Sequence, residues 1–198
     1  MHKLLLSLTL FLTFTLSGCG YNTLQSTDEQ IRANWAEVVN QYQRRADLIP
    51  NLVKTVRSEA TFEQETLIKT IEARYKNLNS IKIDPSNLDN ESFQKFQEAQ
   101  GQMSGLLNRL MVTVENYPTL QSNQGFRALM AELSGTENRI NKARYDFNAT
   151  VNTYNVKVRS FPMNLFAGMF GFKKRDAFQA KEEAQDAPVL PDNIMDTK

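Results

Sequence analysis

The residue best equipped for chemistry in this sequence is Cys19, the only cysteine among 198 residues. It ends the tetrapeptide Leu-Ser-Gly-Cys, directly after an apolar run over residues 4–16. Small residues before a cysteine let the backbone lie extended in a peptidase cleft, and the thiol can carry a diacylglyceryl group. The pattern predicts a lipoprotein signal peptide over residues 1–18 and a mature chain that begins at a lipidated Cys19.

The length of the apolar run favours a signal peptide over a membrane span. It holds about 13 residues, within the roughly 7–15 of a signal-peptide core and fewer than the roughly 20 that cross a bilayer. An uncleaved, slightly short membrane anchor with an incidental cysteine is the alternative. Gly20, not an aspartate, follows the cysteine. If the organism has two membranes, this favours the outer one, with a lipid-anchored protein that faces the periplasm.

The predicted mature chain lacks histidine, because the only histidine is His2. Di-iron bundles use Glu-x-x-His motifs, serine and cysteine hydrolases use a histidine base, and zinc sites favour histidine and cysteine. No acidic cluster has the loop spacing of a calcium site. We therefore expect no enzyme activity and no metal or cofactor.

The charge of the chain is balanced, with 23 Lys and Arg against 22 Asp and Glu. A nucleic-acid-binding surface would need basic residues clustered without matching acids. We therefore expect no nucleic-acid partner.

Polar residues at apolar positions are the remaining candidates for a site. Arg45 falls on the apolar face of the first predicted helix, and Thr136 and Glu137 fall on that of the last. A buried charge is costly unless it is paired. Two interpretations stay open: the long side chains reach the bundle edge, or a polar network fixes the register of the helices. The residues assigned to such a network are Arg45, Asp47, Glu137 and Arg139.

Four helices must position these residues, because apolar residues recur at three- and four-residue spacing in four segments. The first is predicted to begin at Ser26, where Ser26 and Glu29 form a capping box, and to continue past Pro50. Proline removes one helical hydrogen bond and crowds the carbonyl of Ala46, which predicts a functional kink. A shorter helix is expected over residues 67–78, after a second capping box at residues 61–64.

A loop over residues 79–90 separates this pair from two further helices. The third carries apolar residues from Phe93 to Tyr117 and is stopped by Pro118. A long fourth helix runs from Phe126 to Tyr154 and is closed by Pro162. No strand pattern of period two extends beyond a few residues. The predicted fold is all-α, an antiparallel up-and-down four-helix bundle with long first and last helices.

The predicted domain organisation has five parts. They are the signal peptide (1–18), a lipidated linker (19–25), the bundle (26–161), an apolar segment (162–172) and a charged, disordered tail (173–198). Helices that alternate in direction place the apolar segment beside the lipid anchor. Its side chains either pack over the bundle end or contact the membrane or a partner. The residues concerned are Phe161, Leu165, Phe166, Met169, Phe170 and Phe172.

Three stretches of the sequence together resemble the LemA family of bacterial envelope proteins. The first is Arg44–Val53 (Arg-Arg-Ala-Asp-Leu-Ile-Pro-Asn-Leu-Val), and the second is Glu115–Pro118 (Glu-Asn-Tyr-Pro). The third is discontinuous: it begins with Gly135–Ile140 (Gly-Thr-Glu-Asn-Arg-Ile), includes Ala143-Arg144 and Tyr154-Asn155, and ends with Phe161-Pro162. Tyr21-Asn22 fits the family as well. The resemblance covers residues 21–172. It implies a helical bundle with one amino-terminal membrane attachment, outside the cytoplasm, and no established enzymatic activity. Many members look as if they keep a full transmembrane helix, whereas this chain has a short apolar run and Cys19.

Two classes of function follow from these predictions. The favoured one is a non-catalytic lipoprotein that acts as an interaction or scaffolding module for another envelope protein. The alternative is a structural protein that self-assembles into homo-oligomers and organises or shapes the membrane. In both, the partners are the membrane, through the lipid on Cys19, and protein.

Overall fold

The computed structural model describes residues 2–58, 65–78 and 90–179, with side chains described from Gly20 onward except those of Asn90 and Phe166. Within these ranges the regular structure is entirely helical, as predicted. The helices are α1 (His2–Arg57), α2 (Glu65–Leu78), α3 (Asn90–Val114), α4 (Pro118–Ser122), α5 (Gln124–Arg159) and α6 (Met163–Phe170).

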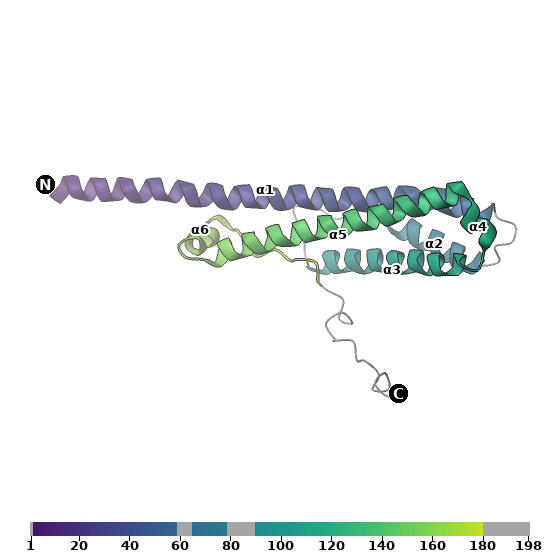
Figure 1. The fold of residues 1–198 in the computed structure, drawn as a ribbon. Coiled ribbons are helices and arrows are strands. Elements are labelled where there is room, and N and C mark those ends of the chain that lie inside the picture. Colours follow the sequence, from purple (N-terminus) through teal and green to yellow (C-terminus); the bar gives the residue numbers. More distant parts are fainter. Residues whose placement is uncertain (1, 59–64, 79–89, 180–198) are drawn as a thin grey trace, which may run out of the picture.

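The pairing of α1 with α5 is the most extensive contact in the rod-shaped molecule (Figure 1). The two helices run in opposite directions, since Thr27 is bonded to Lys157 and Arg44 to Glu132. Helices α2 and α3 pack on each other beside this pair, and the short α4 leads from α3 into α5. Helix α6 contacts both α1 and α5 at the opposite end of the rod.

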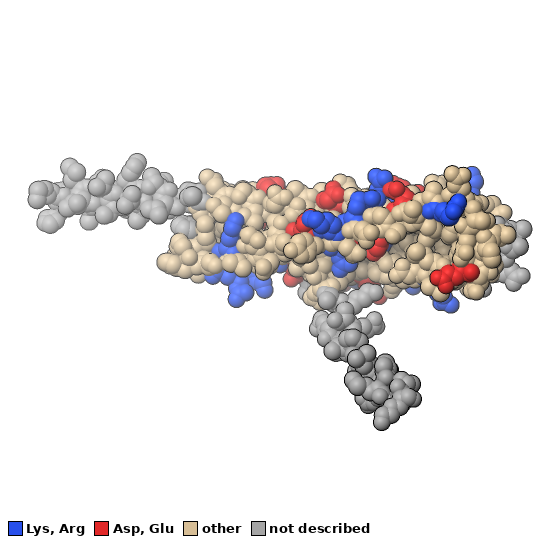
Figure 2. Space-filling model, viewed as in Figure 1, with Lys and Arg blue, Asp and Glu red and all other residues tan. Residues whose placement is uncertain are grey.

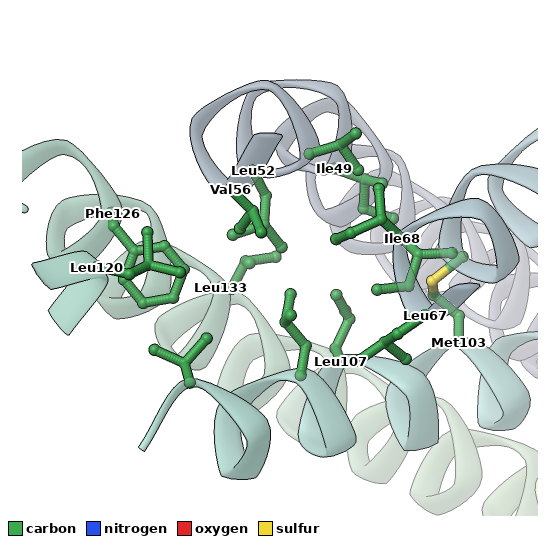
Figure 3. Packing of buried hydrophobic residues seen from close by; sticks show 14 residues of the cluster. Ile49, Leu52, Val56, Leu67, Ile68, Met103, Leu107, Leu120, Phe126 and Leu133 are labelled. Atoms are coloured by element: carbon green, nitrogen blue, oxygen red, sulfur yellow. The ribbon is translucent and has the colours of Figure 1, made fainter. Parts of the chain in front are cut away.

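Two clusters of buried apolar side chains form the core. The Leu52 cluster joins α1, α2, α3, α4 and α5 (Figure 3), with members such as Leu52, Ile68, Met103 and Leu133. The second, which we name the Trp35 cluster, is rich in aromatic residues and contains no residue of α2. Its members are Ile31, Trp35, Val38, Tyr42, Phe93, Phe96, Ile140, Ala143, Phe147, Val151, Tyr154 and Phe178.

The predicted start of the first helix at Ser26 is wrong. Helix α1 already runs through this residue, and the Ser26 hydroxyl donates to the Thr23 carbonyl instead of capping a helix. The physical reason is packing, because Leu24 is fully buried and extends the apolar spacing of α1 towards the amino terminus. Burial of such a side chain stabilises helical structure beyond the local capping signal.

The other predicted helix boundaries are confirmed in part. The apolar spacing correctly predicted α2, α3 and α5. Pro118, predicted only to stop a helix, opens α4 at its first position, where the missing N–H costs nothing. Asn123 caps α5, since its side-chain oxygen accepts from the Phe126 N–H at 3.0 Å. The predicted capping box at 61–64 lies outside the described residues, and so does the predicted loop except for Asn90, which opens α3.

The predicted disorder of residues 173–198 is wrong for residues 173–179; residues 180–198 lie outside the described part. The C-terminal segment (residues 172–179) lies on the bundle, and Phe178 is only 7% exposed. Its ring lies 4.7 Å from that of Phe93, 5.6 Å from that of Phe147 and 6.1 Å from that of Trp35. A charged composition predicted disorder, but this one aromatic side chain completes the Trp35 cluster in place of a fourth helix.

Side-chain amides hold the backbone of this segment. Asn155 accepts from the N–H of Arg175 and donates to its carbonyl, at 2.9 and 2.8 Å. Asn148 makes the same pair of bonds to Phe178, at 2.9 and 3.0 Å. The asparagines are two helical turns apart, about 10.5 Å, and three residues of extended chain span about 10 Å. The match in length allows an extended segment to follow a helix without a strand partner.

We predict that Phe178→Ala lowers the free energy of unfolding by about 3–5 kcal/mol, because it leaves a cavity among buried rings. Urea denaturation followed by far-ultraviolet circular dichroism measures this change. Asp176→Ala is the matched control, since this exposed side chain in the same segment should change stability by less than about 0.5 kcal/mol. Equal stability of Phe178→Ala and wild type would contradict the assigned role of the segment.

Candidate functional site

A layer of polar side chains separates the two apolar clusters. On α1, Arg45 lies between Tyr42 of the Trp35 cluster and Ile49 of the Leu52 cluster. Gln100 on α3 and Thr136 on α5 occupy equivalent positions, and all three residues are buried. We call Arg45, Gln100, Ser104, Thr136 and Glu137 the polar layer.

The guanidinium of Arg45 is the centre of this layer and is 2% exposed. One terminal nitrogen donates to Glu137 Oε2 at 3.0 Å and to Ser104 Oγ at 2.6 Å. The other donates to the backbone carbonyl of Gln100 at 3.2 Å and to its side-chain oxygen. A charge this deeply buried is tolerated only when it is paired and hydrogen-bonded, as it is here.

Tyr42 completes the surroundings of this cation. The Arg45 guanidinium lies 5.0 Å from the centre of the Tyr42 ring, within the range of a cation–π contact. Burial raises the pKa of the Tyr42 hydroxyl, and the positive charges of Arg144 and Arg45 partly offset that increase. The tyrosine therefore stays neutral and supplies a polarisable face to the cation.

The structure brings together only two of the four residues assigned to this network. Arg45 and Glu137 are paired, but Asp47 is exposed and accepts from Gln43 at 2.8 Å. Arg139 is also exposed and bonds to other residues. The reason is helical geometry, since residues two positions apart point to opposite faces of a helix.

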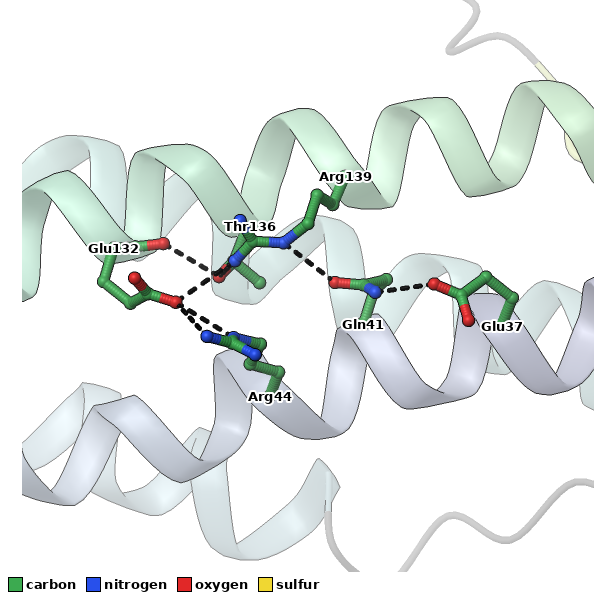
Figure 4. A network of polar contacts seen from close by, with 6 residues as sticks. All are labelled: Glu37, Gln41, Arg44, Glu132, Thr136 and Arg139. Atoms are coloured by element: carbon green, nitrogen blue, oxygen red, sulfur yellow. Dashed lines mark hydrogen bonds and ion pairs between the residues drawn. The ribbon is translucent and has the colours of Figure 1, made fainter.

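Arg139 belongs to a second network on the surface of α1 and α5 (Figure 4). It donates to Thr136 at 2.7 Å and to Glu132 at 3.2 Å. Arg44 binds the same Glu132 oxygen through two nitrogens, at 2.9 and 2.7 Å, and this contact lowers the pKa of the Glu132 carboxyl. The buried and exposed networks thus connect α1 to α5 at the same height along the rod.

Sequence reasoning missed Gln100 and Ser104. Gln100 has a detectable signal, because it stands four residues after Phe96 and three before Met103, where the repeat requires an apolar residue. Ser104 carries no such signal, since a partly buried serine is common on a helix.

Pro50 lies within α1, which continues through it to Arg57. Its side chain is exposed and lines a groove between α1 and α2, together with Val53, Tyr75 and Lys76. The kink at Pro50 stays a prediction.

An exposed apolar stripe marks the α6 end of the rod. Leu165 and Met169 lie four residues apart on α6, and Phe161 lies in the turn that precedes this helix; the three side chains are 61%, 74% and 81% exposed. Phe170 is also exposed, and its ring lies 4.9 Å from that of Tyr21, two residues after Cys19. This places α6 beside the segment that follows Cys19, as expected for helices that alternate in direction.

The other residues predicted to form a contact surface at the α6 end do not extend the exposed stripe in the described part of the structure. Phe172 is partly buried against the Trp35 cluster, so it supports the fold instead of extending the exposed stripe. The side chains of Phe166 and Cys19 lie outside the described part of the structure. Asp28 was missed, although it occupies an apolar position four residues after Leu24; it is buried and pairs with Arg175 at 3.0 Å and Arg32 at 3.3 Å.

In the portion that the structure describes, none of the helices is both long and apolar enough to cross a membrane. Nor do three or more metal-binding side chains come together within it.

We predict that Arg45→Ala lowers the free energy of unfolding by about 3–5 kcal/mol, because it leaves Glu137 and Gln100 without their buried partner. Replacing Arg45, Gln100 and Glu137 together with leucine should recover most of this loss, because the layer is then filled with apolar atoms and no carboxylate is left without its cation. Arg44→Ala is the control, because its pair with Glu132 is exposed and should contribute less than about 1 kcal/mol. Denaturant unfolding measures all three, and equal losses for Arg44→Ala and Arg45→Ala would refute the difference.

Comparison with known proteins places this fold in a family. The model of the LemA family matches residues 34–190. The magnetosome proteins MamQ 1 and MamQ 2 of Paramagnetospirillum magneticum are each 31% identical to this chain in an alignment of 191 positions. The alignment covers 88% of this chain and 70% of each MamQ protein. The magnetosome protein MamQ of Magnetospirillum gryphiswaldense is 31% identical in an alignment of 206 positions, which covers 96% of this chain and 75% of that protein. The chain therefore belongs to the LemA family.

Proposed function

We propose that this protein is a non-catalytic, membrane-anchored envelope protein that acts as an interaction or scaffolding module for another envelope protein. The observation that carries the proposal is the exposed stripe of Phe161, Leu165 and Met169 at α6, the helix whose Phe170 contacts Tyr21. A lipid on Cys19 would hold this end of the rod at the membrane, where apolar side chains enter the interfacial layer. The anchor would lie on the extracytoplasmic side, in the outer membrane if there are two.

The rod itself supports a scaffolding role. We interpret it as an antiparallel four-helix bundle whose long first and last helices act as a spacer. Between Tyr21 and Arg57, α1 extends about 54 Å at 1.5 Å per residue. In its core, Arg45 bonds to Gln100, Ser104 and Glu137, an arrangement that suits rigidity better than turnover. At the end away from the stripe, the groove between α1 and α2 offers an apolar surface to a partner.

The first test concerns the anchor. A clickable fatty-acid analogue fed to cells should label the wild-type protein, because the Cys19 thiol accepts the diacylglyceryl group. Cys19→Ser should carry no label, and Ser17→Ala should keep it as the matched control. Equal labelling of the wild type and Cys19→Ser would contradict the proposal that Cys19 carries the lipid anchor.

The second test concerns the partner surface. A photo-crosslinking residue at Lys54, in the groove, should capture a discrete envelope protein in cells, whereas the same residue at exposed Asn141 on α5 should not. Pro50→Ala should weaken this crosslink with little loss of fold, because a straightened α1 changes the groove. Light scattering of the purified protein should give a monomer. Large assemblies that grow with concentration would favour self-assembly instead.

A further inference from the structure

The sequence around α6 is rich in basic residues and free of acids. Between Asp146 and Asp176 it carries five basic residues and no Asp or Glu. Lys157 is bonded to Thr27 and Arg175 is paired with Asp28. The other three are exposed and form no ion pair with any residue in the described part of the chain: Arg159, Lys173 and Lys174.

Nearby carboxylates leave these three charges largely uncompensated. Asp28 is buried and shared between Arg175 and Arg32, and Glu29 faces Arg32 at 3.6 Å. Asp176 is exposed, and it is the first acid after the three cations. Figure 2 shows Lys and Arg gathered at the α6 end of the visible face, while Asp and Glu lie mostly towards the middle and the other end.

The three charges flank the apolar stripe in the sequence. Arg159 stands two residues before Phe161, and Lys173 and Lys174 follow Phe172. Phe172 comes directly after Gly171, which ends α6 in the left-handed conformation with φ 75°. An apolar stripe with basic residues at its margins is the pattern of a surface that enters the interfacial layer and meets negative headgroups. A protein partner for this stripe would not require three uncompensated cations beside it.

We propose that the α6 end of the rod docks on lipid surfaces that carry anionic headgroups, with Phe161, Leu165 and Met169 entering the interface and Arg159, Lys173 and Lys174 binding the headgroups. This rests on the membrane contact of the proposed function and adds the headgroup chemistry. Each basic residue near an anionic surface strengthens binding about fivefold. The lipid on Cys19 keeps the protein at the membrane, and the docked end sets the orientation of the rod.

The test uses the full-length lipoprotein with Met169→Cys carrying a nitroxide label, reconstituted into vesicles. One set is zwitterionic phosphatidylcholine, and the other contains one part in three of phosphatidylglycerol. Collision with oxygen reports lipid exposure of the label, and collision with a water-soluble nickel chelate reports water exposure. We expect the label in lipid on the anionic vesicles and in water on the zwitterionic ones. Salt raised from about 0.1 M to about 1 M should release it, because the Debye length falls from about 10 Å to about 3 Å.

Variants separate the headgroup contacts from the fold. Lys173→Gln with Lys174→Gln should lower the ratio of docked to undocked protein on anionic vesicles about 25-fold. The control is Arg109→Gln with Arg127→Gln, which removes two exposed charges from α3 and α5 away from α6 and should leave the ratio unchanged. Circular dichroism checks that both double variants keep the helical content of wild type.

The outcomes distinguish this proposal from the one on which it rests. A label equally deep in both kinds of vesicle overturns the headgroup preference but keeps the membrane contact. A label that stays in water on both overturns the lipid contact altogether. A second nitroxide on each chain means that the Cys19 thiol is free, which overturns the lipid anchor of the proposed function.

Discussion

The buried guanidinium of Arg45 is the interaction on which the arrangement of this bundle depends. Its partners come from α3 and α5, so it holds three helices at one height. An apolar repeat alone allows two helices to slide by seven residues, about 10.5 Å, with similar burial. Such a shift would move Arg45 into a purely apolar environment and leave Glu137 without its cation. A buried polar residue in an apolar seam can thereby exclude alternative registers at some cost in stability.

The polar layer also divides the molecule into halves that complete their cores in different ways. In the Leu52 cluster, side chains of α2 pack against those of the other helices. In the Trp35 cluster, which contains no residue of α2, Phe178 of the C-terminal segment takes this place. Asp28 and Arg175 fasten the second half near α6. Helix α6 is supported by α1 through the contact of Phe170 with Tyr21, whose ring also lies 5.9 Å from that of Phe172 in the C-terminal segment.

The sequence allowed prediction of those features that depend on periodicity. Apolar spacing located α2, α3 and α5, and the same spacing placed Arg45 and Glu137 on inner faces. It missed that α1 continues through Ser26, where the buried Leu24 extends the apolar face of the helix towards the amino terminus. The assignment of Asp47 and Arg139 to the network also failed, because each stands two residues from a paired member and a separation of two residues reverses the helix face. The burial of Phe178 was not predicted, because one aromatic residue in a charged segment has no periodic signal.

The hold of Asn148 and Asn155 on the C-terminal segment is directed at backbone atoms. Backbone groups are the same for every residue except proline, so this contact is indifferent to the identity of the side chains between the two attachment points. It is strict about chain length, because three residues of extended chain span the two helical turns that separate the asparagines. The exposed residue 176 can therefore be exchanged freely in type, whereas Ala177 is limited in size because it packs against the Trp35 cluster. An insertion or deletion of one residue between Arg175 and Phe178 would reverse the side-chain alternation and withdraw the phenylalanine from the core.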